Sequence, residues 1–195
     1  MPQPVPRPTV YLAGPEVFLP EAVALGRAKC RLCAEAGFEG VFPLFLERER
    51  ELGPEATARA IAIGLEVQMR VCDGLIANLT PFRGVSADAG TAFEVGFMRA
   101  LGRPVCGYTN VVANYRERGL AARQRGIPPG DGDRPDAEIE DFGLAENLMI
   151  AVAIAECGAP LVTREVAPGR ELTDLEGFRE CLRQLARAFA QPRAT

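Results

Sequence analysis

Two acidic residues, Asp88 and Glu94, have the type and spacing best suited to chemistry in this sequence. They follow the apolar run GLIANLT (residues 74–80), which predicts a strand covered on both faces, and they fall in residues 88–102, which predict a helix. Glu94 should therefore lie near the end of a buried strand, where partial loss of water raises a carboxyl pKa. Two neighbouring carboxylates can divide the roles of nucleophile and acid, as they do in glycoside chemistry.

Each of these candidates also has a purely structural interpretation. Asp88 can cap the helix by accepting backbone N–H bonds, and Glu94 can be a solvated acid on the outer face of the helix. Tyr11, in the first predicted strand, can hydrogen-bond a nucleophilic carboxylate, or it can be a core aromatic residue with a satisfied hydroxyl. The residue types alone leave these alternatives open.

Four further candidates stand where predicted strands end. Gly14 follows the first strand, and Asn78 ends the third strand, where it can hydrogen-bond a loop or a ligand. Phe82 can stack on a base or pack the turn. Arg83 can contact a ligand or anchor the turn PFRG through an ion pair.

The elements that position these residues alternate between strand and helix. Strands are predicted in TVYLAGP (9–15), GVFPL (40–44), GLIANLT (74–80), PVCGYT (104–109) and APLVT (159–163), and helices over 20–38, 54–73, 88–102, 144–157 and 174–190. This alternation predicts an α/β fold with a doubly wound, five-stranded parallel sheet, whose ligands bind beyond the carboxyl ends of the strands. No G-x-G-x-x-G or Walker sequence occupies those ends. Residues 123–143 predict a long loop of the kind that forms lids or interface arms.

Composition restricts the classes of protein further. The chain has 195 residues, of which 48% are hydrophobic, and this suits a single domain. We assign the domain to residues 9–195 and a proline-rich tail to residues 1–8. The net charge is −4 and no stretch concentrates Lys or Arg, so we expect no nucleic-acid partner. No apolar run approaches the roughly 20 residues of a membrane span, so we expect a cytoplasmic protein without a membrane partner.

The sequence contains no histidine. This excludes Ser-His-Asp and Cys-His catalysis, so acid–base chemistry falls to carboxylates, tyrosine, lysine or cysteine. Cys30 and Cys33 form a C-x-x-C pattern, but inside a predicted helix and without a second pair, and we interpret all six cysteines as core residues. We expect neither a metal site nor a cofactor.

Three stretches together resemble the nucleoside 2-deoxyribosyltransferase family: YLAGPEVF (11–18), CDGLIANLTPFRGVSADAGTAFEVGF (72–97) and GLAENLM (143–149). The resemblance implies a flavodoxin-like sheet and a covalent mechanism. In that mechanism a glutamate attacks C1′ of a 2′-deoxynucleoside, and a second base or water then takes the sugar. The implied partners are a small-molecule deoxynucleoside and a nucleobase, and the implied role is nucleotide salvage.

The resemblance also implies roles for individual residues. Glu94 is the nucleophile, Tyr11 orients it, and Asp88 binds the base and can carry a proton to it. Asn147 corresponds to an asparagine that reaches into a neighbouring subunit and holds the sugar 5′-hydroxyl, and Met149 looks like part of the same arm. A homo-oligomer with shared active sites is therefore expected.

Two departures from the family make the base pocket more apolar. Leu65 stands where many relatives carry Asp or Asn against the base, and residues 43–47, PLFLE, replace a run that is often polar. A site that holds an acceptor base poorly can act as a hydrolase, because water then competes for the intermediate.

Two alternative functions follow. One is an N-glycosidase that hydrolyses 2′-deoxynucleosides or their 5′-monophosphates. Relatives that hydrolyse monophosphates tend to carry a Ser/Arg/Gly-rich phosphate loop after the first strand, whereas this chain has GPEVFLPEA (14–22) there, with an acid at Glu16, which disfavours a phosphate. The other is a non-catalytic nucleotide-binding sensor on the same fold. The presence of Glu94, Asp88, Tyr11 and Asn147 argues against the sensor, since a binding module needs no nucleophile.

Overall fold

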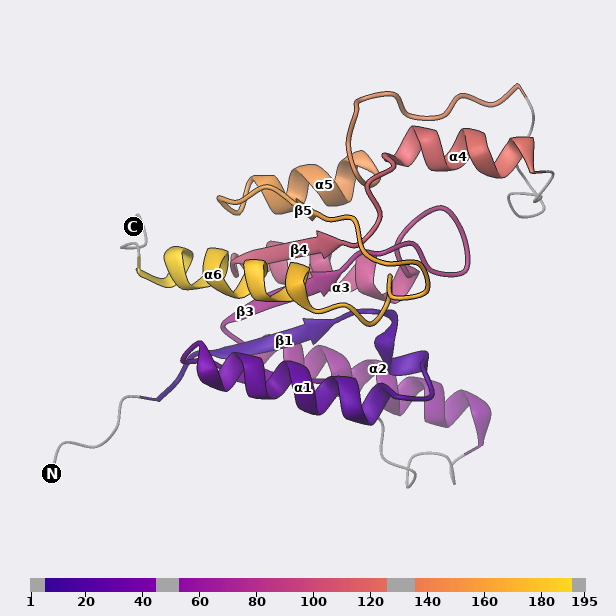
Figure 1. The fold of residues 1–195 in the computed structure, drawn as a ribbon. Coiled ribbons are helices and arrows are strands. Elements are labelled where there is room, and N and C mark those ends of the chain that lie inside the picture. Colours follow the sequence, from indigo (N-terminus) through magenta and orange to yellow (C-terminus); the bar gives the residue numbers. More distant parts are fainter. Residues whose placement is uncertain (1–5, 45–52, 126–135, 191–195) are drawn as a thin grey trace, which may run out of the picture.

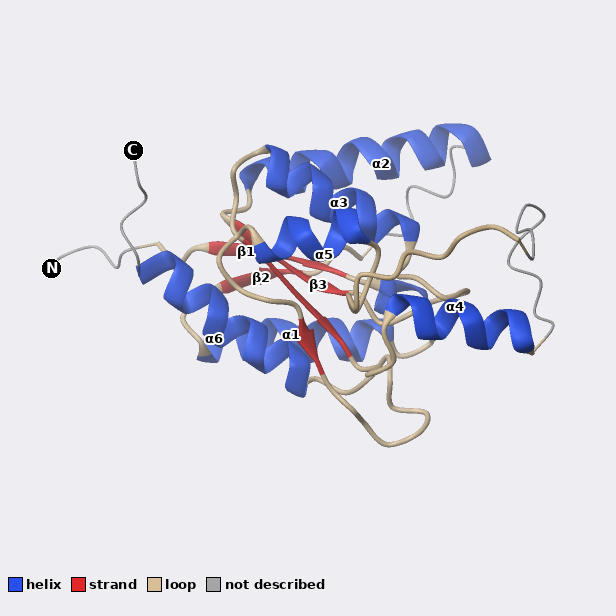
Figure 2. Ribbon diagram, turned by 90° about the horizontal axis from the view of Figure 1, so that it is seen from above, coloured by secondary structure: helices blue, strands red, loops and turns tan. Residues whose placement is uncertain are grey.

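A central sheet with helices on both faces forms the body of the protein (Figures 1 and 2). The computed structural model describes residues 6–44, 53–125 and 136–190. The strands are β1 (Thr9–Ala13), β2 (Glu39–Val41), β3 (Gly74–Asn78), β4 (Val105–Thr109) and β5 (Val162–Thr163). The helices are η1 (Pro15–Phe18), α1 (Ala22–Glu35), α2 (Pro54–Val71), α3 (Ala89–Ala100), α4 (Tyr115–Gln124), α5 (Leu148–Ala155) and α6 (Glu176–Ala190).

The sheet has the order β2-β1-β3-β4-β5, and every pair of neighbouring strands is parallel. This is the flavodoxin-like order, so the predicted fold class is confirmed. Ala13 pairs with Ala77, and Asn78 pairs with Tyr108. The carboxyl ends of β1, β3 and β4 therefore meet at one edge of the sheet.

Side-chain alternation along the strands divides the core into two layers. Val10 and Leu12 of β1 pack with side chains of α1 and α6. Tyr11 and Ala13 point the other way and pack with side chains of α2, α3 and α5. Figure 2 shows these two groups of helices on opposite sides of the sheet.

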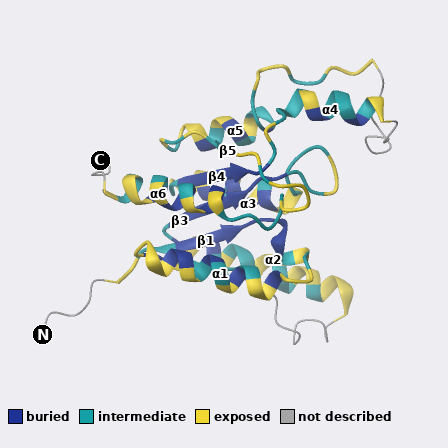
Figure 3. Cartoon of the chain, viewed as in Figure 1, coloured by how far each residue is buried: buried dark blue, intermediate teal, exposed yellow. Residues whose placement is uncertain are grey.

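The central strands are buried, as their continuous apolar runs predict. Every residue of β3 and β4 is buried, and so is every residue of β1 except Thr9 (Figure 3). A polar group placed on the core face of these strands must therefore find a partner inside the protein.

Several predicted boundaries differ from the structure by a few residues, and three of them have a clear local reason. β2 ends at Val41 rather than at residue 44, two residues before Pro43, which has no N–H to donate to a ladder. α5 begins at Leu148 rather than at residue 144, because Asn147 caps it. Residues 123 and 124, predicted as loop, belong to α4, while residues 126–135 of that loop lie outside the described residues.

Helix α4 is absent from the predicted elements. It lies beyond the carboxyl ends of the strands, away from the helices that cover the sheet (Figure 1). Its start is a capping box, in which the Asn114 side chain accepts from the Glu117 N–H and the Glu117 side chain accepts from the Asn114 N–H. The N-x-x-E pattern of residues 114–117 is the sequence signal that marks this start.

The cysteines are free thiols. Cys33, Cys72, Cys106 and Cys181 are buried, as predicted, whereas Cys30 and Cys157 are half-buried. Burial raises the pKa of the Cys33 and Cys106 thiols to about 12, so both are protonated packing residues at neutral pH.

Candidate active site

The side chains of Tyr11 and Glu94 meet between the sheet and helix α3. The Tyr11 hydroxyl donates a hydrogen bond to Glu94 Oε1 across 2.7 Å. Tyr11 is fully buried and Glu94 is 8% exposed. The interpretation of Glu94 as a solvated acid on the outer helix face is therefore wrong, and the Tyr11 hydroxyl contacts the predicted nucleophile.

Burial sets the protonation of this pair. Desolvation raises the pKa of Glu94 to about 7, the Tyr11 hydrogen bond partly opposes that rise, and the negative charge of Asp88 adds to it. Burial, together with the charge of Glu94, also raises the pKa of Tyr11, so the phenol remains a neutral donor. Glu94 thus exchanges between carboxyl and carboxylate near neutral pH, with Tyr11 favouring the carboxylate.

Asp88 is the N-cap of α3. Its Oδ2 accepts from the Thr91 backbone N–H at 3.1 Å and from the Thr91 hydroxyl at 3.4 Å. The capping interpretation is therefore confirmed. Capping does not exclude chemistry, because Oδ1 accepts no hydrogen bond from the described residues. The negative charge of Asp88 raises the pKa of Glu94, so the two carboxyl groups interact electrostatically.

Asn78 and Gly14 have structural partners at the ends of β3 and β1. Asn78 donates to Glu16 Oε1 at 2.9 Å and accepts from the Thr80 N–H at 3.0 Å. A Cβ added at Gly14 would lie 2.0 Å from Glu16 Oε2, so the glycine makes room for this carboxylate. Asn78 could hydrogen-bond a loop or a ligand, and in the structure it hydrogen-bonds the loop that follows β3.

The centre of this arrangement, Glu16, was not a candidate site residue from the sequence. Glu16 is fully buried and forms an ion pair with Lys29, the only lysine of the chain, which is 1% exposed. Tyr108 donates to the same Glu16 oxygen at 3.1 Å. Glu16 itself therefore does not oppose a phosphate, because its carboxylate is buried and paired with Lys29 rather than presented to a ligand. The lack of a Ser/Arg/Gly-rich loop after β1 stays a prediction against a monophosphate.

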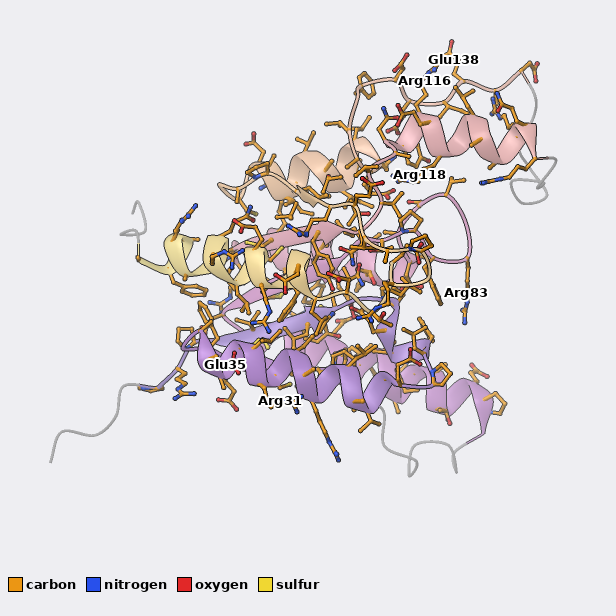
Figure 4. The ribbon with its side chains drawn as sticks, viewed as in Figure 1. Arg31, Glu35, Arg83, Arg116, Arg118 and Glu138 are labelled. Carbon is orange, nitrogen blue, oxygen red and sulfur yellow. The ribbon has the colours of Figure 1, made fainter. Side chains whose placement is uncertain are left out.

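Phe82 and Arg83 lie on the loop after β3 and form a stack with Phe18 of η1. The Phe18 and Phe82 rings are 5.6 Å apart and nearly parallel. The Arg83 guanidinium lies 4.8 Å from the Phe18 ring and 4.7 Å from the Phe82 ring. Arg83 forms no ion pair with a described residue, so the anchor is this cation–π contact rather than the ion pair that we considered. Figure 4 shows Arg83 extending from the outer side of its loop.

Asn147 and Met149 stand at the start of α5. Asn147 Oδ1 accepts from the Met149 N–H at 3.0 Å, and Asn147 Nδ2 donates to Glu140 at 2.7 Å. The Met149 side chain is 72% exposed, although it is large and apolar. Within one chain, these two residues form an ordered and partly exposed corner.

No group of three His, Cys, Asp or Glu residues in the described parts of the chain is arranged to hold a metal ion. In the same parts, no helix combines the length and apolarity needed to cross a membrane.

Comparison with known proteins identifies the family. Residues 10–149 match the nucleoside 2-deoxyribosyltransferase family, and this span contains every candidate site residue from Tyr11 to Met149. The chain belongs to that family. It is 34% identical over 199 residues to the uncharacterized protein C191.05c of Schizosaccharomyces pombe, covering 94% of this chain and 91% of that protein.

Two solved structures share this fold, and one of them is a deoxyribosyltransferase. The 2-desoxiribosyltransferase from Leishmania mexicana superposes with a TM-score of 0.58 at 26% identity, over 80% of this chain and 89% of its own. A conserved protein from Enterococcus faecalis V583 superposes with a TM-score of 0.55 at 17% identity, over 92% of this chain and 99% of its own, and it shares the fold. The deoxyribosyltransferase family and the first of these structures indicate a deoxyribosyltransferase-like enzyme.

One departure from the family pattern is now located. Leu65 of α2 is partly buried and packs against the core cluster that contains Tyr11. The position at which the resemblance leads us to expect a polar residue is therefore filled by an apolar side chain on the same side of the sheet as Glu94.

Proposed function

We propose that this protein transfers 2-deoxyribose between nucleobases through a covalent intermediate on Glu94. One observation carries the proposal: the buried Glu94 carboxyl accepts a hydrogen bond from Tyr11, and its pKa is raised to about 7 by burial and by the charge of Asp88. The family match supplies the substrate class, a 2′-deoxynucleoside.

In the first step, an oxygen of the Glu94 carboxylate forms a bond to C1′ as the C1′–N bond to the base breaks. The electron pair of that bond goes to the base, and a proton from water reaches the base through Asp88. A buried anion beside C1′ stabilises the positive charge that develops on the sugar.

In the second step, a nitrogen of another base attacks C1′ and the Glu94 ester bond breaks. Asp88 takes the proton that the incoming base loses. The bond electrons return to Glu94, where the Tyr11 hydroxyl stabilises the carboxylate as it forms. Two displacements at C1′ retain the configuration of the nucleoside.

We propose in addition that the active site is shared between copies of the chain in a homo-oligomer. Asn147 would bind the sugar 5′-hydroxyl of a neighbouring subunit, with Met149 beside it. Large apolar side chains are exposed on the layer formed by α2, α3 and α5, and such a surface suits a second copy. They are Ile63, Val67, Val71, Phe93, Met149 and Val152.

The alternative is hydrolysis of 2′-deoxynucleosides or their 5′-monophosphates. Leu65 favours it, because an apolar side chain offers an acceptor base no hydrogen bond and leaves water to compete. Since the Glu16 charge is compensated by Lys29, monophosphates stay among the candidate substrates. In either case we expect a cytoplasmic salvage enzyme.

The test is incubation of the pure protein with 2′-deoxyinosine, with and without adenine, followed by chromatography. We expect 2′-deoxyadenosine from the wild type and none from Glu94→Gln, with a deoxyribosyl adduct on Glu94 detected by mass spectrometry when adenine is omitted. Glu180→Gln, on the opposite face of the sheet, is the matched control and should behave as wild type.

Other outcomes discriminate between the functions. Hypoxanthine and free deoxyribose in amounts unaffected by adenine would identify a hydrolase. If no deoxynucleoside or monophosphate in a panel is turned over, and Glu94→Gln changes only affinity, the protein is a nucleotide-binding sensor and the proposal is wrong.

A further inference from the structure

A second buried ion pair joins Arg118 of α4 to Glu146, which immediately precedes Asn147. The Arg118 Nη2 to Glu146 Oε2 distance is 2.8 Å, and the two side chains are 8% and 1% exposed. Neither residue was a candidate from the sequence. Burying two charged groups is costly, so a buried ion pair is stable only when neighbouring groups also hydrogen-bond both side chains.

Glu146 binds two segments that are far apart in the sequence. Its carboxylate accepts from the Ser86 hydroxyl and from the Ala87 N–H at 3.3 Å, which are the two residues before Asp88. It also accepts from the Asn147 N–H at 3.1 Å. One carboxylate therefore holds the loop that leads into Asp88 together with the residue proposed to bind the neighbouring sugar.

Arg118 holds the same two segments through backbone carbonyls. Its Nε donates to Val85 O at 2.6 Å, and its Nη1 donates to Ala145 O at 2.8 Å and to Ala113 O at 2.7 Å. In Figure 4 Arg118 lies on the inner side of α4, whereas Arg116 projects from its outer side near Glu138. Several bonds in different directions need the planar fork of a guanidinium, which a lysine ammonium lacks.

We propose that Arg118 and Glu146 are positioning residues that place Asp88 in its own active site and Asn147 in the neighbouring one. The inference rests on the proposed function. Asp88 contributes to departure of the base, and Asn147 contributes to binding of the sugar. Loss of the ion pair should therefore lower kcat, because Asp88 is misplaced, and raise KM, because Asn147 is misplaced. The choice of substrate separates these two effects.

The experiment compares Glu146→Gln and Arg118→Lys with wild type on two substrates. The base of 2′-deoxyinosine needs a proton to leave, whereas 7-methyl-2′-deoxyguanosine releases a base that is already cationic in the nucleoside and needs none. We expect kcat for 2′-deoxyinosine to fall between about tenfold and a hundredfold, the range that a small misplacement produces. For 7-methyl-2′-deoxyguanosine we expect little change in kcat, and for both substrates KM should rise.

Arg116→Met is the matched control, because it breaks the exposed ion pair between Arg116 and Asp141 on the same helix. It should leave both kinetic constants as in wild type. An equal fall in kcat on both substrates, or kinetics equal to wild type in a folded Glu146→Gln protein, would overturn the inference.

A second measurement keeps this inference separate from the proposed function. Hydrogen exchange should be at least about tenfold faster at the Ala87 and Asn147 amides in Glu146→Gln than in wild type, since both amides lose a charged acceptor. If the wild type turns over no substrate, the proposed function fails while this result still supports the positioning role. Unchanged exchange at both amides would overturn the positioning role whatever the activity.

Discussion

The hydroxyl of Tyr11 in the first strand lies 2.7 Å from Oε1 of Glu94, a residue 83 positions later in the chain. Both side chains are buried, so loss of water and the hydrogen bond between them together set their pKa values.

The pH dependence of the wild type should follow the protonation of Glu94. Because only the carboxylate is a nucleophile, kcat/KM for 2′-deoxyinosine should rise with pH through about 7. Tyr11→Phe loses the bond that favours the carboxylate, so its rise should move to higher pH by about one unit, the effect of one charged hydrogen bond. Identical profiles for the two proteins would show that Tyr11 does not act on the nucleophile.

Removing the Glu94 charge should stabilise the fold at alkaline pH. Below about 4.5 the side chain is protonated in both folded and unfolded chains. Between 4.5 and about 7 the folded chain keeps the proton that the unfolded chain loses, so wild-type stability falls as pH rises through this window.

We therefore expect Glu94→Gln to be more stable than wild type at pH 8. The pKa rise from 4.5 to about 7 corresponds to about 3 kcal/mol of unfolding free energy at most. The gain should disappear near pH 4 when urea unfolding is repeated there. A variant no more stable than wild type at pH 8 would mean that Glu94 carries no burial penalty.

The two roles of Asp88 can be separated by two substitutions. Asp88→Asn keeps an oxygen that accepts from the Thr91 N–H, so its stability should stay near wild type. Asp88→Ala should lose about 1 kcal/mol, the contribution of an N-cap. Both should lower kcat for 2′-deoxyinosine by about 100-fold or more, because both lack the proton donor. Full activity in Asp88→Asn would reduce Asp88 to a helix cap.

A shared active site predicts complementation between inactive variants. Glu94→Ala and Asn147→Ala should each have little activity alone. When the two are mixed under conditions that exchange subunits, each site that pairs an intact Glu94 with an intact Asn147 from its neighbour should work. For random mixing of a dimer we expect about a quarter of wild-type activity. A mixture no more active than its components would place each complete site within one chain.

The Glu16–Lys29 pair should matter for stability far more than surface pairs do. Lys29→Met leaves Glu16 charged and buried without its counter-ion, and we expect urea unfolding to report a loss of about 3–5 kcal/mol. The double variant Glu16→Gln, Lys29→Met should recover part of this loss. Arg70→Ala, which breaks an exposed pair with Glu66, should cost less than about 1 kcal/mol. Equal losses for Lys29→Met and Arg70→Ala would contradict the importance of this buried pair.

The order of helices and strands is largely a property of the local sequence. Continuous apolar runs predict β1, β3 and β4, since a strand covered on both faces carries no polar alternation. Helix α4 was missed because its sequence is polar and its stabilising contacts, those of Arg118, come from distant residues.

The sequence by itself supplied the candidate residues, Tyr11, Asp88 and Glu94, and the absence of histidine left acid–base chemistry to carboxylates, tyrosine, lysine or cysteine. Only the tertiary structure decided their environments. Whether Glu94 is solvated or buried depends on which face of α3 meets the sheet, and whether Glu16 faces a ligand depends on Lys29. These contacts join residues that are remote in sequence, so local sequence patterns do not predict them. Burial and charge pairing in the folded chain set the protonation and the role of each carboxyl group.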